Sequence, residues 1–153
     1  MEVQAWVRDN GLSLNAEKTQ VGDCRIKGEG FEFLGYRFEA GYRNVRAKSL
    51  ATFKDAIRAK TGRSRGDSLA KIVADLNPLL RGWYGYFQHC RPRTFAELDK
   101  FVRRRLRAIL RKQTKRPGMG WAPQDHYRWP IAYFAATGLF TLYAARVQAS
   151  QSR

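Results

Sequence analysis

Five cations between residues 100 and 111 recur at a spacing that could place their side chains along a row of phosphates. On a helix, which turns 100° per residue, they would share one side. They are Lys100, Arg103, Arg104, Arg107 and Arg111. Guanidinium groups bind phosphate oxygens through paired hydrogen bonds, and neighbouring cations on a helix repel one another unless an anion neutralises them. A solvated surface helix is the alternative, but the scarcity of acids on this side favours contact with nucleic acid.

Other basic and aromatic residues could extend this contact. Arg63 and Arg65 occupy a polar loop, and three further cations follow the basic helix. These three are Lys112, Lys115 and Arg116. Tyr84 and Tyr86, with Arg81 beside them, could stack on bases or ribose, or they could pack in the core. Both interpretations of these aromatic residues stay open.

No pattern predicts catalysis or a metal site. Asp9, Glu17 and Asp23 lie near predicted strands, but the sequence has no Asp–Asp pair to hold two magnesium ions. His89 and His126 are isolated and lack the spacing of metal ligands or of a nucleophile's base. We therefore predict no catalytic residue and no metal ligand.

The charge distribution supports a polyanionic partner. The 153-residue chain carries a net charge of +16; residues 1–42 hold five basic and seven acidic residues, whereas residues 43–153 hold twenty-four and six. Nucleic acid is the expected partner, since the most apolar stretch, Ile131–Val147, is shorter than the roughly 20 residues of a spanning helix. The chain opens without a signal-peptide pattern, and Cys24 and Cys90 form no CxxC motif. A reduced, cytoplasmic protein without a membrane partner is expected.

Hydrophobic periodicity predicts an α+β fold in which a short β region precedes helices. A helix over Val3–Asn10 is followed by strands Gln20–Lys27 and Phe31–Phe38, which flank a turn at Gly28–Gly30. A third strand is predicted at Tyr42–Val45, after a turn at Ala40–Gly41.

Helices are expected after Arg46. The first ends before Gly62, and a second apolar stripe runs from Leu69 to Phe87. Pro78 is predicted to start a new helix there, with Asn77 as its N-cap. Thr94 is predicted to cap the basic helix through a capping box, and Trp121–Val147 to fold back as one helix. The buried side of the basic helix is expected to carry Phe95, Leu98, Val102, Leu106 and Ile109.

Four segments carry a resemblance to one family. They are GLSLNAEKT at Gly11–Thr19, FEFLGYRF at Phe31–Phe38, LNPLLRGWYGYF at Leu76–Phe87, and the arginine-rich helix at Phe95–Arg107. Together they resemble the end of the palm and the start of the thumb in group II intron reverse transcriptases, the intron-encoded maturases. The thumb motif is the specific one.

The resemblance implies two parts: a palm remnant with a β-hairpin at residues 1–46 and a helical thumb, the maturase-specific domain, at residues 47–153. Lys18 would then lie beside the incoming nucleotide. A primer-grip-like hairpin would comprise Phe33, Leu34, Gly35 and Tyr36. The family's magnesium-binding aspartates are expected upstream of Met1. The chain is therefore expected not to act as an enzyme or to hold Mg²⁺ alone, unless a palm partner supplies those carboxylates.

The expected ligand is structured intron RNA or an RNA–DNA duplex, bound to assist splicing and retrohoming in a bacterial-type ribonucleoprotein. One alternative is a subunit or fragment of an RNA-directed DNA polymerase that is active only with a palm-and-fingers partner. Another is a nonfunctional remnant of a mobile element. An exposed apolar patch around Phe33, Leu34, Tyr36 and Phe38 is expected to bind such a partner or to promote self-association.

Overall fold

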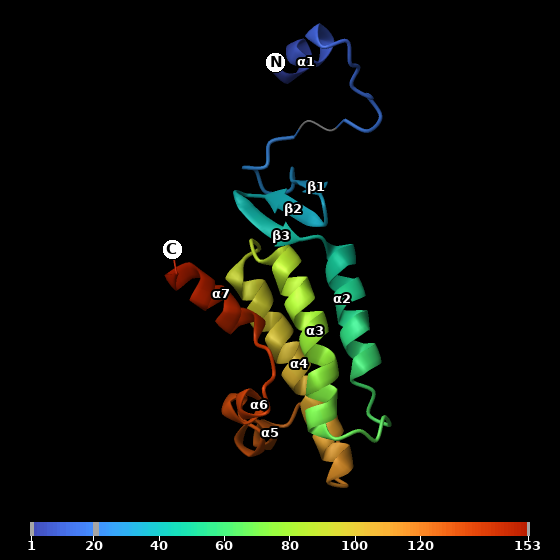
Figure 1. Ribbon diagram of the computed structural model, residues 1–153, viewed down its shortest axis with the longest axis vertical. Coiled ribbons are helices and arrows are strands. Elements are labelled where there is room, and N and C mark those ends of the chain that lie inside the picture. Colours follow the sequence, from blue (N-terminus) through green and yellow to red (C-terminus); the bar gives the residue numbers. More distant parts are fainter. Residues whose placement is uncertain (1, 20–21, 153) are drawn as a thin grey trace.

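A computed structural model describes residues 2–19 and 22–152 and has the predicted α+β fold (Figure 1). A three-stranded antiparallel sheet precedes a helical bundle. The elements run in the order α1 (Glu2–Asp9), β1 (Phe31–Phe33), β2 (Tyr36–Glu39), β3 (Tyr42–Val45), α2 (Ala47–Lys60), α3 (Leu69–Phe87), α4 (Pro92–Gln113), α5 (Pro123–Arg128), α6 (Ile131–Ala136) and α7 (Leu142–Gln151).

The sheet has its first hairpin at a different place from the predicted one. Strands β1 and β2 lie within the single strand predicted at Phe31–Phe38 and are joined by Leu34 and Gly35, with φ angles of 49° and 82°. Two positive φ angles are typical of a type I′ turn, which matches the twist of paired strands. Residues 22–27 form turns and no strand, while Gln20 and Val21 lie outside the described residues. The third strand and its turn are confirmed.

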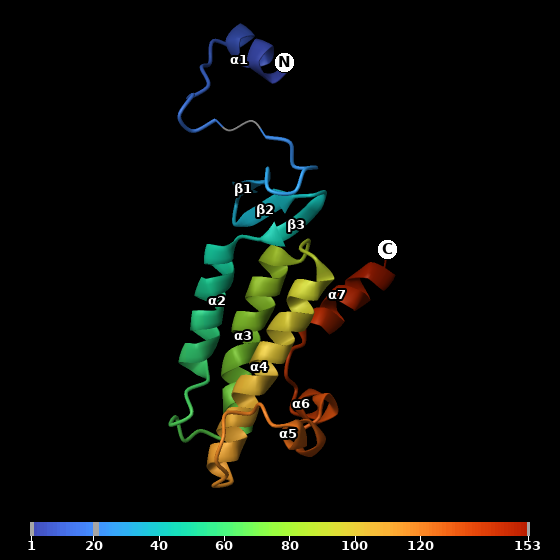
Figure 2. The ribbon, with the colours of Figure 1, turned by 180° about the vertical axis from the view of Figure 1, so that it is seen from behind.

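Helices α2, α3 and α4 run alongside one another and enclose the core (Figures 1 and 2). The five apolar residues predicted for the inner side of α4 are all buried there. They meet a stripe from α2 and α3 that includes Phe53, Ile57, Leu76 and Leu80. Burial of these large side chains supplies most of the stabilisation of the bundle.

α3 is one continuous helix, so the predicted break at Pro78 is wrong. Proline removes one hydrogen bond to the carbonyl four residues earlier, at Ala74. Ala74 is exposed, so water can satisfy that carbonyl. Asn77 instead bridges to the chain before α7: its amide donates to the Gly138 carbonyl at 2.8 Å, and its oxygen accepts from the Phe140 N–H at 2.8 Å.

The ends of α4 and the C-terminal segment also differ from the predictions. α4 begins at Pro92 with Arg91 as its N-cap, so Thr94 lies inside the first turn and no capping box forms. The segment after α4 is three short helices and not one. Pro130 follows the C-cap of α5 and is itself the N-cap of α6. Gly138, with a φ of 82°, lies between α6 and α7.

Two tyrosines join the sheet to the bundle. The Tyr36 hydroxyl on β2 donates to the Tyr86 carbonyl on α3 at 2.7 Å, and the Tyr86 hydroxyl donates to the Leu34 carbonyl at 2.8 Å. Gly35 lies against Phe87, where a side chain at Gly35 would come within 3.2 Å of the ring. The turn of the first hairpin is therefore fixed on the last turns of α3.

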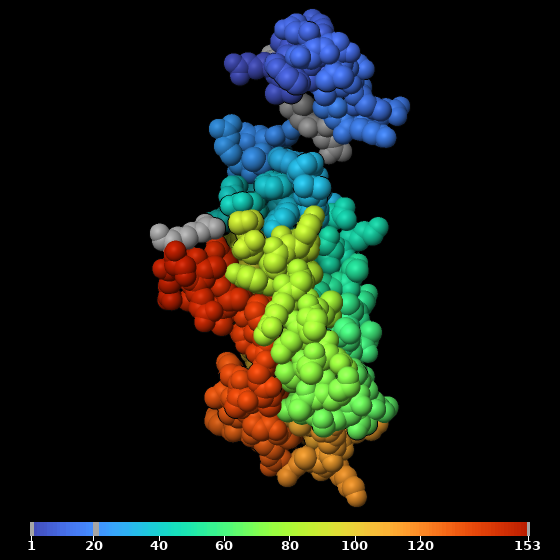
Figure 3. Space-filling view, in the orientation of Figure 1, coloured from blue at the N-terminus to red at the C-terminus, as the bar shows by residue number. Residues whose placement is uncertain are grey.

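α1 confirms the predicted N-terminal helix, and none of its residues is buried. In the space-filling view it lies beyond the sheet, away from the bundle (Figure 3). Across residues 2–19 and 22–152, no helix combines the length and the apolar character needed to cross a membrane.

Candidate nucleic-acid interface

Arg107 of α4 points into the protein. Its side chain is only 3% exposed, and its Nε and Nη2 donate to the Trp129 carbonyl oxygen at 3.1 and 2.9 Å. Trp129 is the C-cap of α5, where helix carbonyls lack intrahelical partners. Arg107 therefore satisfies the end of α5 and holds it against α4.

Arg111, one turn further along α4, has a similar role. Its Nε donates to both carboxylate oxygens of the buried Asp125 at 2.8 Å, and its Nη1 donates to the Pro117 carbonyl. Although sequence spacing groups Arg107 and Arg111 with the phosphate-binding candidates, both are engaged within the protein. We assign them a structural role.

The other three cations of the predicted set face the surface. Lys100 is exposed, while Arg103 and Arg104 are half-buried. Burial lowers the pKa of the Arg103 guanidinium from its ordinary value, against the attraction of Asp99. Burial and the nearby charge of Arg58 lower the pKa of Arg104. Burial and a neighbouring positive charge disfavour the charged form of these guanidinium groups. A bound anion would stabilise that charged form.

α2 adds two cations that the sequence interpretation missed. The Lys54 ammonium and the Arg58 guanidinium lie 5.7 and 5.3 Å from the ring centre of Phe101 on α4, and the Arg104 guanidinium lies 5.3 Å from it. Three cations thus surround one aromatic ring. We call the surface formed by Lys54, Arg58, Lys100, Arg103 and Arg104 the α2–α4 basic face. The four-residue spacing of Lys54 and Arg58 is a signal that could have identified them.

A pocket of about 450 Å³ opens beside this face. Its walls come from α4, from the loop before α5, from His126 of α5 and from Ile131, the first residue of α6. The lining comprises Glu97, Lys100, Phe101, Arg103, Arg104, Arg107, Gly120, Trp121, His126 and Ile131. Its one acid, Glu97, pairs with Arg93 at 2.9 Å. Trp121 is 72% exposed, and the Arg104 guanidinium lies 4.4 Å from the centre of its ring. The arrangement can hold a planar group and an anion together.

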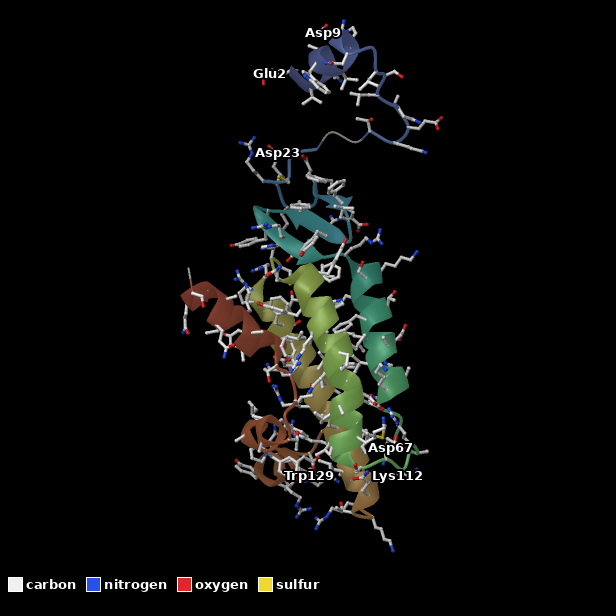
Figure 4. The ribbon with its side chains drawn as sticks, viewed as in Figure 1. Glu2, Asp9, Asp23, Asp67, Lys112 and Trp129 are labelled. Atoms are coloured by element: carbon white, nitrogen blue, oxygen red, sulfur yellow. The ribbon has the colours of Figure 1, made fainter. Side chains whose placement is uncertain are left out.

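The remaining predicted cations gather at the far end of the bundle. Figure 4 shows Lys112 and Asp67 at the same end as Trp129. Arg63 donates to the Gly118 carbonyl at 3.2 Å, and Lys112 donates to the Ser64 hydroxyl at 3.0 Å.

Arg65 binds two carboxylates and a carbonyl and is therefore also structural. Its partners are Asp67, Asp75 and the Lys60 carbonyl. Lys115 and Arg116 are exposed.

The two tyrosines on α3 that are candidates for contact with RNA differ in their surroundings. The Tyr84 ring packs against Phe95 and Phe140, with ring centres 5.4 and 6.0 Å apart, and contributes to the core. Arg81 is exposed and its guanidinium lies 5.4 Å from the Phe140 ring centre. Tyr86 is 55% exposed, but its hydroxyl is engaged with the hairpin.

The primer-grip-like hairpin presents only part of the predicted apolar patch. Phe33 and Leu34 are 60% and 65% exposed, whereas Tyr36 and Phe38 are half-buried because Tyr36 packs on Phe87 and Phe38 stacks on Phe31. 

Lys18 is exposed and lies with Glu32 and Arg37 around an open pocket beside the sheet. Within residues 2–19 and 22–152, no three His, Cys, Asp or Glu side chains gather where they could hold a metal ion.

The family model for the group II intron maturase-specific domain matches residues 50–129, just over half of the chain. The chain belongs to this family. The resemblance seen in the sequence is thereby confirmed for the helical part. Among curated proteins, none matched the chain.

The matched residues of this maturase-specific domain run from the first turns of α2 to the C-cap of α5. They contain the whole α2–α4 basic face and the Arg107–Trp129 contact. The sheet precedes the matched region, and α6 and α7 follow it. The family assignment and the basic surface therefore coincide in one part of the molecule.

Proposed function

We propose that this maturase-specific domain binds structured RNA through the α2–α4 basic face. The observation that carries the proposal is the gathering of five cations from two helices around Phe101 and the adjacent pocket. In the described part of the chain, these five cations form one ion pair with an acid, which joins Arg58 to Asp55 at 2.6 Å. A face so short of acids attracts a phosphate backbone.

The ligand that fits the family best is group II intron RNA, or an RNA–DNA duplex held by the same phosphate contacts. Such contacts fix the position and orientation of a nucleic acid more than they read its sequence. We propose that binding assists the intron in reaching its splicing-active fold and supports retrohoming. The sequence has no Asp–Asp pair for two-metal chemistry. The proposed role is therefore assistance, with Mg²⁺ entering only if a palm partner supplies carboxylates.

The first test is the salt dependence of RNA affinity. The logarithm of the association constant should fall linearly with the logarithm of salt concentration, by roughly 0.7 to 0.9 for each phosphate contact. Five contacts predict a slope of roughly −4 for a structured intron RNA. A slope near zero, or no binding at low salt, would contradict the proposal.

A second candidate function rests on the exposed Phe33 and Leu34 at the tip of the first hairpin. These residues could bind a palm-and-fingers polypeptide or a second copy of the chain, and the protein would then be a polymerase subunit. Size-exclusion chromatography over a range of concentrations tests self-association. Magnesium-dependent primer extension by the purified chain alone would contradict the proposal that it needs a partner for catalysis.

A further inference from the structure

The pocket beside the α2–α4 basic face differs from a surface that only follows phosphates. Most of the surface that lines it is apolar, and Phe101 of α4 and Ile131 of α6 contribute to that surface. Its volume of about 450 Å³ falls in the range of about 300 to 1,000 Å³ seen for small-ligand sites. A phosphate alone would not use such a lining, because phosphate oxygens gain nothing from apolar contact.

The tryptophan at the pocket is held in place by its neighbour in the chain. Gly120 has a φ of 81°, and a Cβ at this position would lie 2.6 Å from the Arg104 carbonyl oxygen and 2.9 Å from the Ala108 nitrogen. The loop therefore lies directly on the backbone of α4. This close approach sets Trp121 beside Arg104 and leaves 72% of its surface exposed.

The cations at the pocket mouth define the charge of its occupant. Lys100, Arg103 and Arg104 all line the pocket, and in the described residues none of the three forms an ion pair or hydrogen bond to an acid. Glu97, the one acid of the lining, is paired with Arg93. Trp121 offers an exposed aromatic surface on which a planar ring can stack. A planar ring that carries a negatively charged group would match both features of the pocket.

We propose that this pocket takes one unpaired nucleotide of the bound RNA, with its base on Trp121 and its phosphate at Lys100, Arg103 or Arg104. The proposal rests on the proposed RNA-binding function and adds a preference to it. Bases inside a duplex are already stacked, whereas a bulged or single-stranded base can be splayed onto an aromatic side chain. The domain should therefore favour RNA with a bulge over RNA that is fully paired.

The test compares two RNA hairpins whose strands are joined by a non-nucleotide linker, so that no loop base is unpaired. One has a single-nucleotide bulge in its stem, and the other is fully paired. Stacking of one base is worth a gain in affinity of roughly fivefold or more, so the protein should bind the bulged hairpin at least that much more tightly. Trp121→Ala should abolish the preference, so that the bulged and the paired hairpin bind with equal affinity. Trp121→Phe should retain part of it, because a smaller ring still stacks.

Trp6 provides the matched control, since it is also exposed, at 61%, but lies on α1 and not at the pocket. Trp6→Ala should preserve the preference. As a direct readout, 5-iodouridine at the bulge should cross-link under ultraviolet light to the peptide that contains Trp121. Cross-linking at Trp6 or elsewhere would overturn the assignment.

The two proposals fail in different ways. Equal affinity of the wild-type protein for both hairpins, with the expected salt slope, would overturn the nucleotide pocket and leave RNA binding intact. Absence of binding to either hairpin at low salt would overturn both.

Discussion

The buried guanidinium of Arg107 donates two hydrogen bonds to the carbonyl oxygen of Trp129, the residue that ends α5. This contact joins the middle of α4 to a residue 22 positions later in the chain. Its neighbour Arg103, one turn earlier, lines the pocket on the surface. Two arginines one turn apart on one helix thus differ in role: Arg107 stabilises the end of α5, and Arg103 belongs to the face that we propose to bind RNA.

Replacing Arg107 should weaken the fold and leave the electrostatics of RNA binding unchanged. Arg107→Ala removes both donors from a buried carbonyl, and we expect the free energy of unfolding in urea to fall by about 2 to 3 kcal/mol. Lys100→Ala, at an exposed position, should stay within about 0.5 kcal/mol of the wild type but lower RNA affinity. The assignment would be wrong if Arg107→Ala kept full stability and reduced the salt slope.

Tyr86 should contribute to stability through the hairpin and not through RNA. Tyr86→Phe removes the hydrogen bond to the Leu34 carbonyl, and we expect a loss of about 1 kcal/mol in the free energy of unfolding. Amide hydrogen exchange in β1 and β2 should accelerate. Tyr127→Phe is the control, because Tyr127 is 87% exposed and should show no change. If the two variants were equally stable, the hydrogen bond from Tyr86 to the Leu34 carbonyl would make no measurable contribution to stability.

Gly120 should resist substitution more strongly than another glycine with the same backbone conformation. Gly120→Ala combines a strained positive φ with a clash against the α4 backbone, so we expect a loss of about 2 to 3 kcal/mol. Gly138 has a φ of 82° but nothing within 4 Å of a built Cβ. Gly138→Ala should therefore lose only about 1 kcal/mol, from backbone strain. Equal losses in urea unfolding would show that the loop does not lie on α4.

Asp99 should give the stability curve a characteristic pH dependence. Its carboxylate accepts from the Leu142 and Tyr143 N–H groups at 3.0 and 2.9 Å. Burial nevertheless raises the pKa of Asp99 above its ordinary value of 3.8, against those hydrogen bonds and the charge of Arg103. Between the unfolded and folded pKa values, the folded state holds a proton that the unfolded chain has released. This group's contribution to stability therefore falls as pH rises through that window.

The measurement is urea unfolding from pH 3 to pH 7 for the wild type and Asp99→Asn. The wild-type free energy minus that of the variant should decline as pH rises above 3.8 and then level off. A difference that rises with pH would mean that the two N–H donors outweigh burial.

The core of the bundle could be predicted from sequence because burial follows a local period. Leu98, Val102 and Leu106 recur at helical spacing, and all three are buried. The first hairpin could not be placed in this way. Gly28 and Gly30 form the stronger local turn signal, whereas the observed turn puts Leu34 at a positive φ that few leucines adopt. The contacts of the turn with α3 override local preference.

The candidate interface was predictable only in part. The spacing of the α4 cations correctly placed Lys100, Arg103 and Arg104 outside the core, but it could not separate them from Arg107 and Arg111. The partners of those two residues come from the C-terminal segment, which the sequence suggested was a single helix. Residues that contact one another across such distances in the chain carry no local signal.

The central claim is tested most directly by removing four cations from the α2–α4 basic face and measuring the salt dependence of RNA affinity. The variant replaces Lys54, Lys100, Arg103 and Arg104 by alanine. A control with the same change in net charge replaces Arg8, Lys18, Arg25 and Lys27, which precede the sheet. Circular dichroism should show that both variants are folded.

The salt slope of the face variant should become shallower by roughly 3, and that of the control should stay close to the wild-type value. An unchanged slope in the face variant, or an equal loss in the control, would contradict binding of RNA by the α2–α4 basic face.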